Sequence, residues 1–229
     1  VFTRGDIAAG FAQSDVIVEN TFTVARVHQS FLEPHCCLVW IDDRDRVQMW
    51  SPNKVPHGLK ESMAAAFGIP AERIRVNPVA IGGDFGGKGA PVDEPICYLL
   101  ALRGGRPVKM VMEYREEFVA GAPRHAAVLW LKTGVKQDGT IVAHEMDAYL
   151  DSGAYGGFRP GAVVGGIAHA GGCYRAECAR IRVSRVDTNN IPGGQMRAPA
   201  EPQGSFAAQS HIDCVARRLQ MDPLDFRLK

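Results

Sequence analysis

The chain has 229 residues, of which 46% are apolar, so it can bury a core as one large domain or as two lobes of about 100 residues each. Its 26 basic and 25 acidic residues give a formal charge of +1, which argues against a nucleic-acid-binding protein and against binding to an anionic membrane. Because its apolar runs are shorter than the roughly 20 residues of a spanning helix and no leader opens the chain, we expect a cytoplasmic protein with no membrane partner.

Six cysteines are spread along the chain without the spacing of a metal site. A zinc ribbon needs two closely spaced pairs and an iron-sulfur site needs a clustered set, and neither pattern is present. We therefore expect reduced cysteines that pack as small apolar groups. They are Cys36, Cys37, Cys97, Cys173, Cys178 and Cys214.

The N-terminal part of the chain predicts strands and helices that lead to a glycine-rich loop. Apolar and β-branched runs indicate the strands. Pro56 at the start of one predicted helix and Gly68 just after it follow the preference for proline first and glycine last. The predicted elements are a helix at Asp6–Phe11, strands at Val16–Val24, Cys37–Asp42 and Arg46–Trp50, a helix at Pro56–Phe67 and a strand at Ile74–Ile81.

The remainder of the chain predicts a similar mixture of elements. "KQDG" at Lys136–Gly139 is typical of a hairpin turn. Gly153–Gly172 is too rich in glycine for a regular element and is expected to form a long loop. The predicted elements are a helix at Pro95–Arg103, strands at Val108–Glu113, Ala126–Lys136, Thr140–Leu150 and Ile181–Thr188, and a helix at Gln203–Leu219.

A sequence echo links two glycine turns. "RIRVNPVAIGGDFGG" from Arg73 is similar to "RIRVSRVDTNNIPGGQMRAP" from Arg180, a shift of 180 − 73 = 107 residues. We interpret 1–229 as an α+β lobe of duplicated β-β-α-β units, with mixed sheets, helices packed on them and an internal repeat at approximately 15–91 and 92–229. The two turns should then meet in one cleft. The alternative is a chance similarity between two strands of common composition.

The loop "AIGGDFGGKGAP" at residues 80–91 fits neither of two phosphate-binding motifs. Its glycines do not have the G-x-G-x-x-G spacing of a dinucleotide fingerprint, and Gly89 stands where a mononucleotide-binding loop needs a hydroxyl. Two interpretations stay open. The loop can present backbone N–H groups to an anion or an oxo group, or it can be a tight connection against a neighbouring strand.

Five stretches match one protein family in order and spacing. They are "GDIAAGFAQSDVIVEN", "EPH" at Glu33–His35, "GGDFGGK", "GRPVKMVMEYREEFVAGAPRHA" and "MRAPAEPQGSFAAQSHIDCVARRLQMDPLDFR". Together they resemble the molybdenum-binding large subunit of the xanthine dehydrogenase and aldehyde oxidase family. The resemblance covers almost the whole chain and corresponds to the N-terminal half of the molybdopterin-binding region, so we expect a piece of a longer subunit.

The resemblance implies a molybdenum-pterin cofactor whose metal needs no protein side-chain ligand. Phe85 and Gly86 are expected to lie against an oxo group of the metal, with a backbone N–H of the loop as donor, and Arg197 is expected in the same shell. The resemblance assigns no catalytic side chain to this chain. The residues that it implies for cofactor binding are Gly83, Phe85, Gly86, Gly87, Arg197 and Lys54.

The reaction that the resemblance implies is hydroxylation of a small-molecule aldehyde or N-heterocycle, with water as the oxygen source. Electrons would leave through iron-sulfur and FAD centres on partner subunits, because the cysteines of this chain could not hold a cluster. The family's catalytic glutamate stands in a Gly-x-Gly-Glu segment. No Gly-Glu dipeptide occurs in these 229 residues, so we expect an oxidoreductase chain that is inactive by itself.

Departures from the family pattern argue against xanthine as the substrate. Lys54 stands where a glutamine is usual, Asp84 replaces a loop glycine, and Met196 replaces a phenylalanine. Gly89 and a glycine near Gly166 stand where purine enzymes carry a glutamate and an arginine. Because two of these changes affect the immediate surroundings of the metal, the alternative is a noncatalytic relative that acts as an interaction or assembly module.

Several polar residues near the matched motifs have simpler interpretations. Lys88 is expected to close the glycine loop or to lie in solvent, and Glu33 to pair locally. His35 is expected to be a hydrogen-bonded strand histidine rather than a catalytic group. Arg124 and His125 are expected to be structural.

Overall fold

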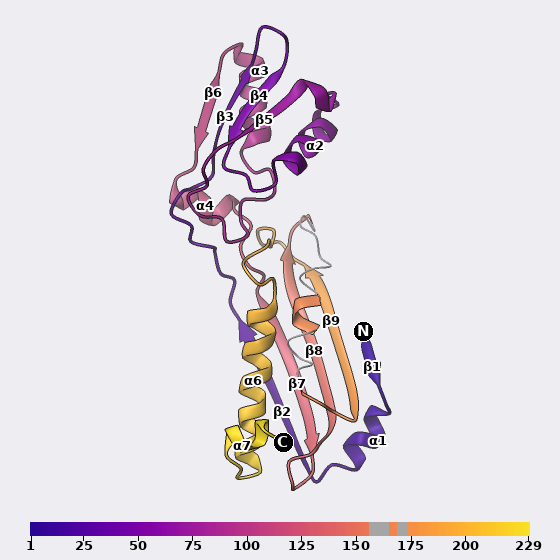
Figure 1. Ribbon diagram of the computed structural model, residues 1–229. Coiled ribbons are helices and arrows are strands. Elements are labelled where there is room, and N and C mark those ends of the chain that lie inside the picture. The colour runs from indigo at the N-terminus through magenta and orange to yellow at the C-terminus, as the bar shows by residue number, and fades with distance from the viewer. Residues whose placement is uncertain (156–164, 169–173) are drawn as a thin grey trace. The chain divides into compact units, whose positions relative to one another are not determined.

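The computed structural model describes all residues except 156–164 and 169–173 (Figure 1). The chain forms two compact units. One unit comprises Val1–Val27, Arg124–Gly193 and Ala198–Lys229, and the other comprises His28–Pro123 and Gly194–Arg197. Each contains a mixed β-sheet with helices packed on it, which confirms the predicted α+β class. The internal repeat at approximately 15–91 and 92–229 stays a prediction.

The first unit is built on a five-stranded sheet in the order β1-β9-β8-β7-β2. β8 and β9 are parallel, and every other neighbouring pair is antiparallel. The long helix α6 lies along β2 and β7 (Figure 1). The elements are β1 (Phe2–Arg4), α1 (Ile7–Ala12), β2 (Val16–Val24), β7 (Ala127–Val135), β8 (Ile141–Gly153), β9 (Cys178–Asp187), α6 (Glu201–Arg218) and α7 (Pro223–Arg227).

The core of the first unit follows from the apolar spacing of its strands and of α6. Buried and more exposed residues alternate along most of β7, and the fully buried Leu129 and Leu131 lie on the same face of the strand. Ala207 and Ala208 of α6 belong to the same core cluster, and their small side chains allow the helix to approach the sheet closely.

The second unit is built on a four-stranded sheet in the order β5-β4-β3-β6. β4 and β5 are parallel, and β3 is antiparallel to both β4 and β6. The run β3-β4-α2-β5 is therefore one β-β-α-β unit. The elements are β3 (Cys36–Ile41), β4 (Val47–Ser51), α2 (Pro56–Phe67), the 3-10 turn η1 (Ala71–Arg73), β5 (Ile74–Pro78), α3 (Glu94–Gly104), β6 (Val108–Val111) and α4 (Tyr114–Ala120).

Helix α2 and the register of β4 with β5 place the glycine loop. The helix begins with Pro56 and ends before Gly68, whose φ of +64° is the left-handed conformation that favours glycine. It returns the chain so that β5 lies parallel to β4, with Ser51 opposite Pro78. The residues that follow both strands therefore leave the sheet at the same edge.

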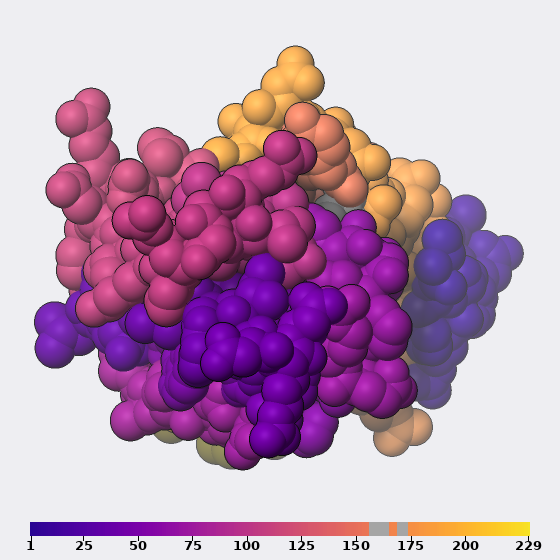
Figure 2. Space-filling model, turned by 90° about the horizontal axis from the view of Figure 1, so that it is seen from above, coloured from indigo at the N-terminus to yellow at the C-terminus, as the bar shows by residue number. Residues whose placement is uncertain are grey.

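A single core lies between the sheet and the helices of the second unit. It contains Val39 and Met49 from the sheet, Leu59 from α2 and Cys97 from α3, all fully buried. Figure 2 shows the outer surface of this unit in its purple-to-pink segments. The described cysteines are free thiols, and Cys173 lies outside the described residues.

The predicted elements are present, with bounds that shift by a few residues, and the hairpin turn at Lys136–Gly139 is also found. The sequence prediction missed β1 and α4. The predicted loop Gly153–Gly172 lies mostly outside the described residues. Within the described part of the chain, no helix combines the length and the apolar character needed to cross a membrane.

Candidate functional site

The glycine loop at residues 82–89 requires glycine at particular positions. Gly83 and Gly86 have φ values of +99° and +110°, which L side chains rarely adopt. A Cβ atom on Gly86 would also lie 2.7 Å from the backbone oxygen of Gln195. The glycines are therefore needed both for the conformation of the loop and for its close approach to another segment.

That other segment is the second glycine turn. The N–H of Arg197 donates to the carbonyl oxygen of Phe85 at 2.6 Å. The Gln29 side chain also holds this turn, because its Nε2 donates to the carbonyls of Gln195 at 2.7 Å and Ala122 at 2.8 Å. The structure thus brings the two turns into contact, as the sequence echo predicts.

Asp84 organises the glycine loop from within. Its carboxylate accepts hydrogen bonds from the N–H of Gly86 at 2.9 Å and of Lys88 at 2.6 Å. The Nζ of Lys54 lies 3.0 Å from the same carboxylate. Burial would raise the pKa of Asp84, but these hydrogen bonds and the Lys54 charge outweigh it, so the pKa is lowered.

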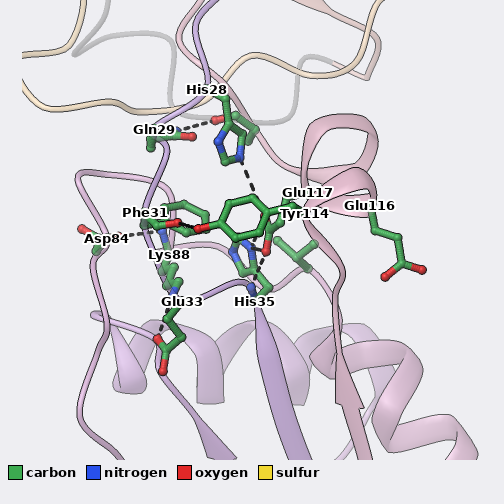
Figure 3. A network of polar contacts seen from close by, with 12 residues as sticks. His28, Gln29, Phe31, Glu33, His35, Asp84, Lys88, Tyr114, Glu116 and Glu117 are labelled. Carbon is green, nitrogen blue, oxygen red and sulfur yellow. Dashed lines mark hydrogen bonds and ion pairs between the residues drawn. The ribbon is translucent and has the colours of Figure 1, made fainter.

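Lys88 and Glu33 fasten the base of the loop (Figure 3). The Nζ of Lys88 is buried, lies 2.6 Å from Oε2 of Glu33 and sits 4.8 Å from the centroid of the Phe31 ring. The same Glu33 oxygen accepts the N–H of Gly82 at 2.9 Å. Lys88 therefore closes the loop and Glu33 pairs locally, as we expected.

A buried carboxylate supports the segment that precedes β3. Glu117 of α4 is fully buried and lies 2.9 Å from Nδ1 of His35, whose backbone N–H also donates to it (Figure 3). Burial lowers the pKa of His35, but the hydrogen bond and the charge of Glu117 outweigh it, so the pKa is raised. His28 lies farther away, at 3.8 Å, and burial lowers its pKa. His35 is thus a hydrogen-bonded structural histidine.

The sequence prediction missed α4, although it contains a recognisable signal. Glu113 and Glu116 form a capping box, in which each carboxylate accepts the backbone N–H of the other residue. The Tyr114 hydroxyl donates to the backbone oxygens of Phe31 and Leu32 (Figure 3). The E-x-x-E spacing could have identified the start of this helix, but not its contacts with a segment about 80 residues away.

A second buried carboxylate, Asp93, precedes α3 and differs from Glu117 in its surroundings. Within the described part of the chain, no N–H or O–H of another residue donates to its oxygens, and the neighbouring Cys37 thiol is only a weak donor. Burial, and then the charge of Glu94, raise its pKa to about 6. Glu94 itself accepts a hydrogen bond from the Ser51 hydroxyl at 2.7 Å, which links the start of α3 to the end of β4.

In the first unit, Arg124 has a structural environment. Its guanidinium donates to Gln203 Oε1 at 3.0 Å and to the Ala198 carbonyl at 3.2 Å, and Gln203 in turn donates to the His125 carbonyl at 3.1 Å. Elsewhere in the first unit, Gly166 lies close to the backbone of another segment. A Cβ atom on Gly166 would lie 2.1 Å from the Pro199 oxygen, so this position has no room for a side chain.

The glycine loop can accept an oxygen-rich anionic group. In the part of the chain that the structure describes, the N–H groups of Asp84 and Phe85 donate no hydrogen bond to the protein. Phe85, at φ +45°, leaves 48% of its side chain exposed beside them. Backbone donors in a side-chain-poor bend suit phosphate and oxo groups. Among the same residues, no cluster of three or more His, Cys, Asp or Glu side chains is arranged to hold a metal ion.

The same α+β fold is found in solved structures of oxidoreductases and dehydrogenases, among them a copper- and molybdenum-containing CO dehydrogenase. Aldehyde oxidoreductase from Desulfovibrio gigas superposes with a TM-score of 0.91 and 29% identity over 98% of this chain and 25% of its own. CO dehydrogenase from Oligotropha carboxidovorans superposes with a TM-score of 0.90 and 26% identity, over 99% of this chain and 29% of its own. The molybdopterin cofactor-binding domain model matches residues 1–229, so the chain belongs to that family.

Curated relatives agree with this assignment. A chain of a probable xanthine dehydrogenase from Bacillus subtilis is 34% identical over all of this chain and 31% of its own length. The large molybdopterin subunit of nicotinate dehydrogenase from Eubacterium barkeri is 30% identical over 98% of this chain and 53% of its own. The chain therefore spans about a third and about half of these two relatives. The family resemblance of the sequence is confirmed.

Proposed function

We propose that this chain forms the glycine-loop wall of a molybdopterin site in a molybdenum hydroxylase. The observation that supports this most strongly is the contact between the two glycine turns through Arg197 N–H and the Phe85 oxygen. Two turns separated by more than a hundred residues in the sequence supply one continuous backbone surface. The proposed cofactor-binding residues are Gly83, Phe85, Gly86, Gly87, Arg197 and Lys54.

When bound, the molybdenum-pterin group supplies a Lewis acid and a two-electron acceptor for hydroxylation by water. The chain's own contribution is to bind and orient. The N–H groups of Asp84 and Phe85 can donate to oxygens of the bound group, and the exposed Phe85 ring offers an apolar surface for it to pack on. The fixed backbone of the two turns keeps these donors in place before the group binds.

The proposed substrate is an aldehyde or an N-heterocycle other than a purine. Gly89 offers no carboxylate, and a glycine near Gly166 stands at the position where purine enzymes are expected to carry an arginine. Relatives include an aldehyde oxidoreductase and a nicotinate dehydrogenase, which supports both substrate classes. We further propose iron-sulfur and FAD partner subunits and a cytoplasmic location, and we expect the 229-residue chain to be inactive alone.

The test is cofactor and substrate analysis of the natural polypeptide that carries this chain, purified with its partners from a host that makes molybdopterin. We expect molybdenum and pterin in equal amounts, and oxidation of aldehydes or N-heterocycles, but not xanthine, with an artificial electron acceptor. A protein that lacks both molybdenum and pterin would contradict the proposal and favour the noncatalytic alternative.

A further inference from the structure

Two positions at which this chain departs from the pattern expected of its family meet in space. Lys54 follows the end of β4 and Asp84 lies in the loop after β5, and their Nζ and Oδ2 atoms are 3.0 Å apart. Because β4 and β5 are parallel, both residues leave the sheet at the same edge. Lys54 or Asp84 alone would place an unpaired charge beside the loop, whereas the pair has no net charge.

The pair is part of the loop rather than an isolated surface ion pair. One oxygen of Asp84 accepts the N–H of Gly86 and the other accepts the N–H of Lys88. Lys54 contacts the loop a second time, because its backbone N–H donates to the Lys88 oxygen at 2.9 Å. The Cε atom of Lys54 would lie 3.0 Å from a Cβ on Gly89, so its side chain packs closely on the loop.

We propose that Asp84 is an internal anion of the glycine loop, whose carboxylate occupies the Gly86 and Lys88 amides, and that Lys54 is the positioning residue that holds it there. An oxyanion that arrives from solvent must displace the Asp84 carboxylate to reach these two amides. The negative charge of this carboxylate also repels it. The amides of Gly86 and Lys88 are therefore closed to a free dianion such as inorganic phosphate. The amides of Asp84 and Phe85 stay available to a ligand that is anchored elsewhere.

The identity of that ligand rests on the proposed function, but the occupation of the two amides does not. It can be measured as residue-resolved amide hydrogen exchange of the natural polypeptide by mass spectrometry, with or without molybdenum. In Asp84→Gly, which restores the glycine usual in the family, exchange at Gly86 and Lys88 should be faster by about ten-fold, because each loses a hydrogen bond to a charged acceptor. Inorganic phosphate should slow this exchange in Asp84→Gly and leave the wild type unchanged.

The role of Lys54 is tested by a double-mutant cycle. Lys54→Gln should speed exchange at the same two amides by about two- to five-fold in the wild-type background and not at all in Asp84→Gly. Lys54→Arg, which keeps the charge, should retain the wild-type rates. Asp45→Asn, which removes a carboxylate paired with Arg73 elsewhere in the same unit, is the matched control and should change neither amide.

Three outcomes would overturn the proposal. They are equal exchange in wild type and Asp84→Gly, protection of the wild type by phosphate, and an equal effect of Lys54→Gln in both backgrounds. The amides of β3 and β4 report whether a variant is folded. If Asp84→Gly is unfolded, comparison of Lys54→Gln with Lys54→Arg decides the question. Absence of molybdenum would contradict the proposed function and leave this inference intact.

Discussion

Several ionisable side chains of the second unit are shielded from water. Lys88, Asp93 and Glu117 are each nearly inaccessible to solvent. Burial disfavours the charged form of each group, so a charge persists only where a partner offsets the cost. Lys88 and Glu117 have such partners, Glu33 and His35, and Asp93 has none of comparable geometry within the described residues.

Asp93 should therefore destabilise the fold when it is ionised. Its pKa rises from 3.8 in the unfolded chain to about 6 in the folded one, so the folded state binds the extra proton. Stability should fall as pH rises from about 4 to about 6 and stay low above that. Asp93→Asn should remove this slope and raise the free energy of unfolding at neutral pH by ~2 kcal/mol, measured by urea denaturation.

The exposed Asp43→Asn is the control and should leave the pH profile unchanged. A lower stability of Asp93→Asn at neutral pH would show that the ionised carboxylate is stabilising, contrary to this account.

The charged pair of Glu117 and His35 should stabilise the fold, whereas ionised Asp93 destabilises it. The pKa of Glu117 is lowered from 4.5, because hydrogen bonds and charge from His35 outweigh burial, so its contribution is lost as pH falls through the lowered value. The pKa of His35 is raised from 6.5, so its contribution is lost as pH rises through the raised value. Stability from this pair is fully present only between these limits.

Glu117→Gln should remove the loss of stability at both the acidic and the basic end of this pH range. It should also lower the free energy of unfolding by about 3 kcal/mol, because the buried His35 imidazole loses its charged partner. Denaturation across the pH range measures this, with the exposed Glu61→Gln as control. A wild-type pH profile in Glu117→Gln would rule out this role of the pair.

The short helix α4 (Tyr114–Ala120) contributes two contacts to the segment before β3. It supplies Glu117 to His35 and the Tyr114 hydroxyl to the carbonyls of Phe31 and Leu32. A helix of this length is marginal by itself, so it depends on its capping box and on these contacts. The helix and the segment before β3 therefore stabilise each other.

Tyr114→Phe should lower the free energy of unfolding by about 1 kcal/mol, because two carbonyl oxygens lose a donor while the ring keeps its packing. Thermal denaturation measures this, and Tyr155→Phe is the control, since Tyr155 is 96% exposed. An unchanged melting temperature in Tyr114→Phe would show that the segment before β3 is held by other contacts.

The long elements could be predicted from the sequence because their periodicity is strong. β2 alternates between more and less exposed residues over its whole length, and α2 has proline and glycine at its ends. The short elements β1 and α4 were missed because their positions depend on long-range contacts, such as the pairing of β1 with β9. β5 ends at Pro78, earlier than predicted, where the chain turns into the loop.

For the whole molecule, the sequence was sufficient for the fold class and for the contact between the two glycine turns. The echo between them marks the turns, and the hydrogen bond from Arg197 to Phe85 joins them. The pairing of Lys54 with Asp84 could not be predicted, because each was recognised only as a single departure from the family pattern. Their proximity follows from the parallel register of β4 and β5, which sequence periodicity does not specify.

The central claim is that the contact between the two turns builds the molybdopterin site. Its most direct test is the molybdenum and pterin content of Gly86→Ala, in which the added methyl would clash with the Gln195 backbone, beside that of Gly105→Ala. Gly105 also has a positive φ, of +59°, but has open space around it. We predict that Gly105→Ala keeps both molybdenum and pterin and that Gly86→Ala, although folded, loses them. Full cofactor content in a folded Gly86→Ala protein would contradict the claim.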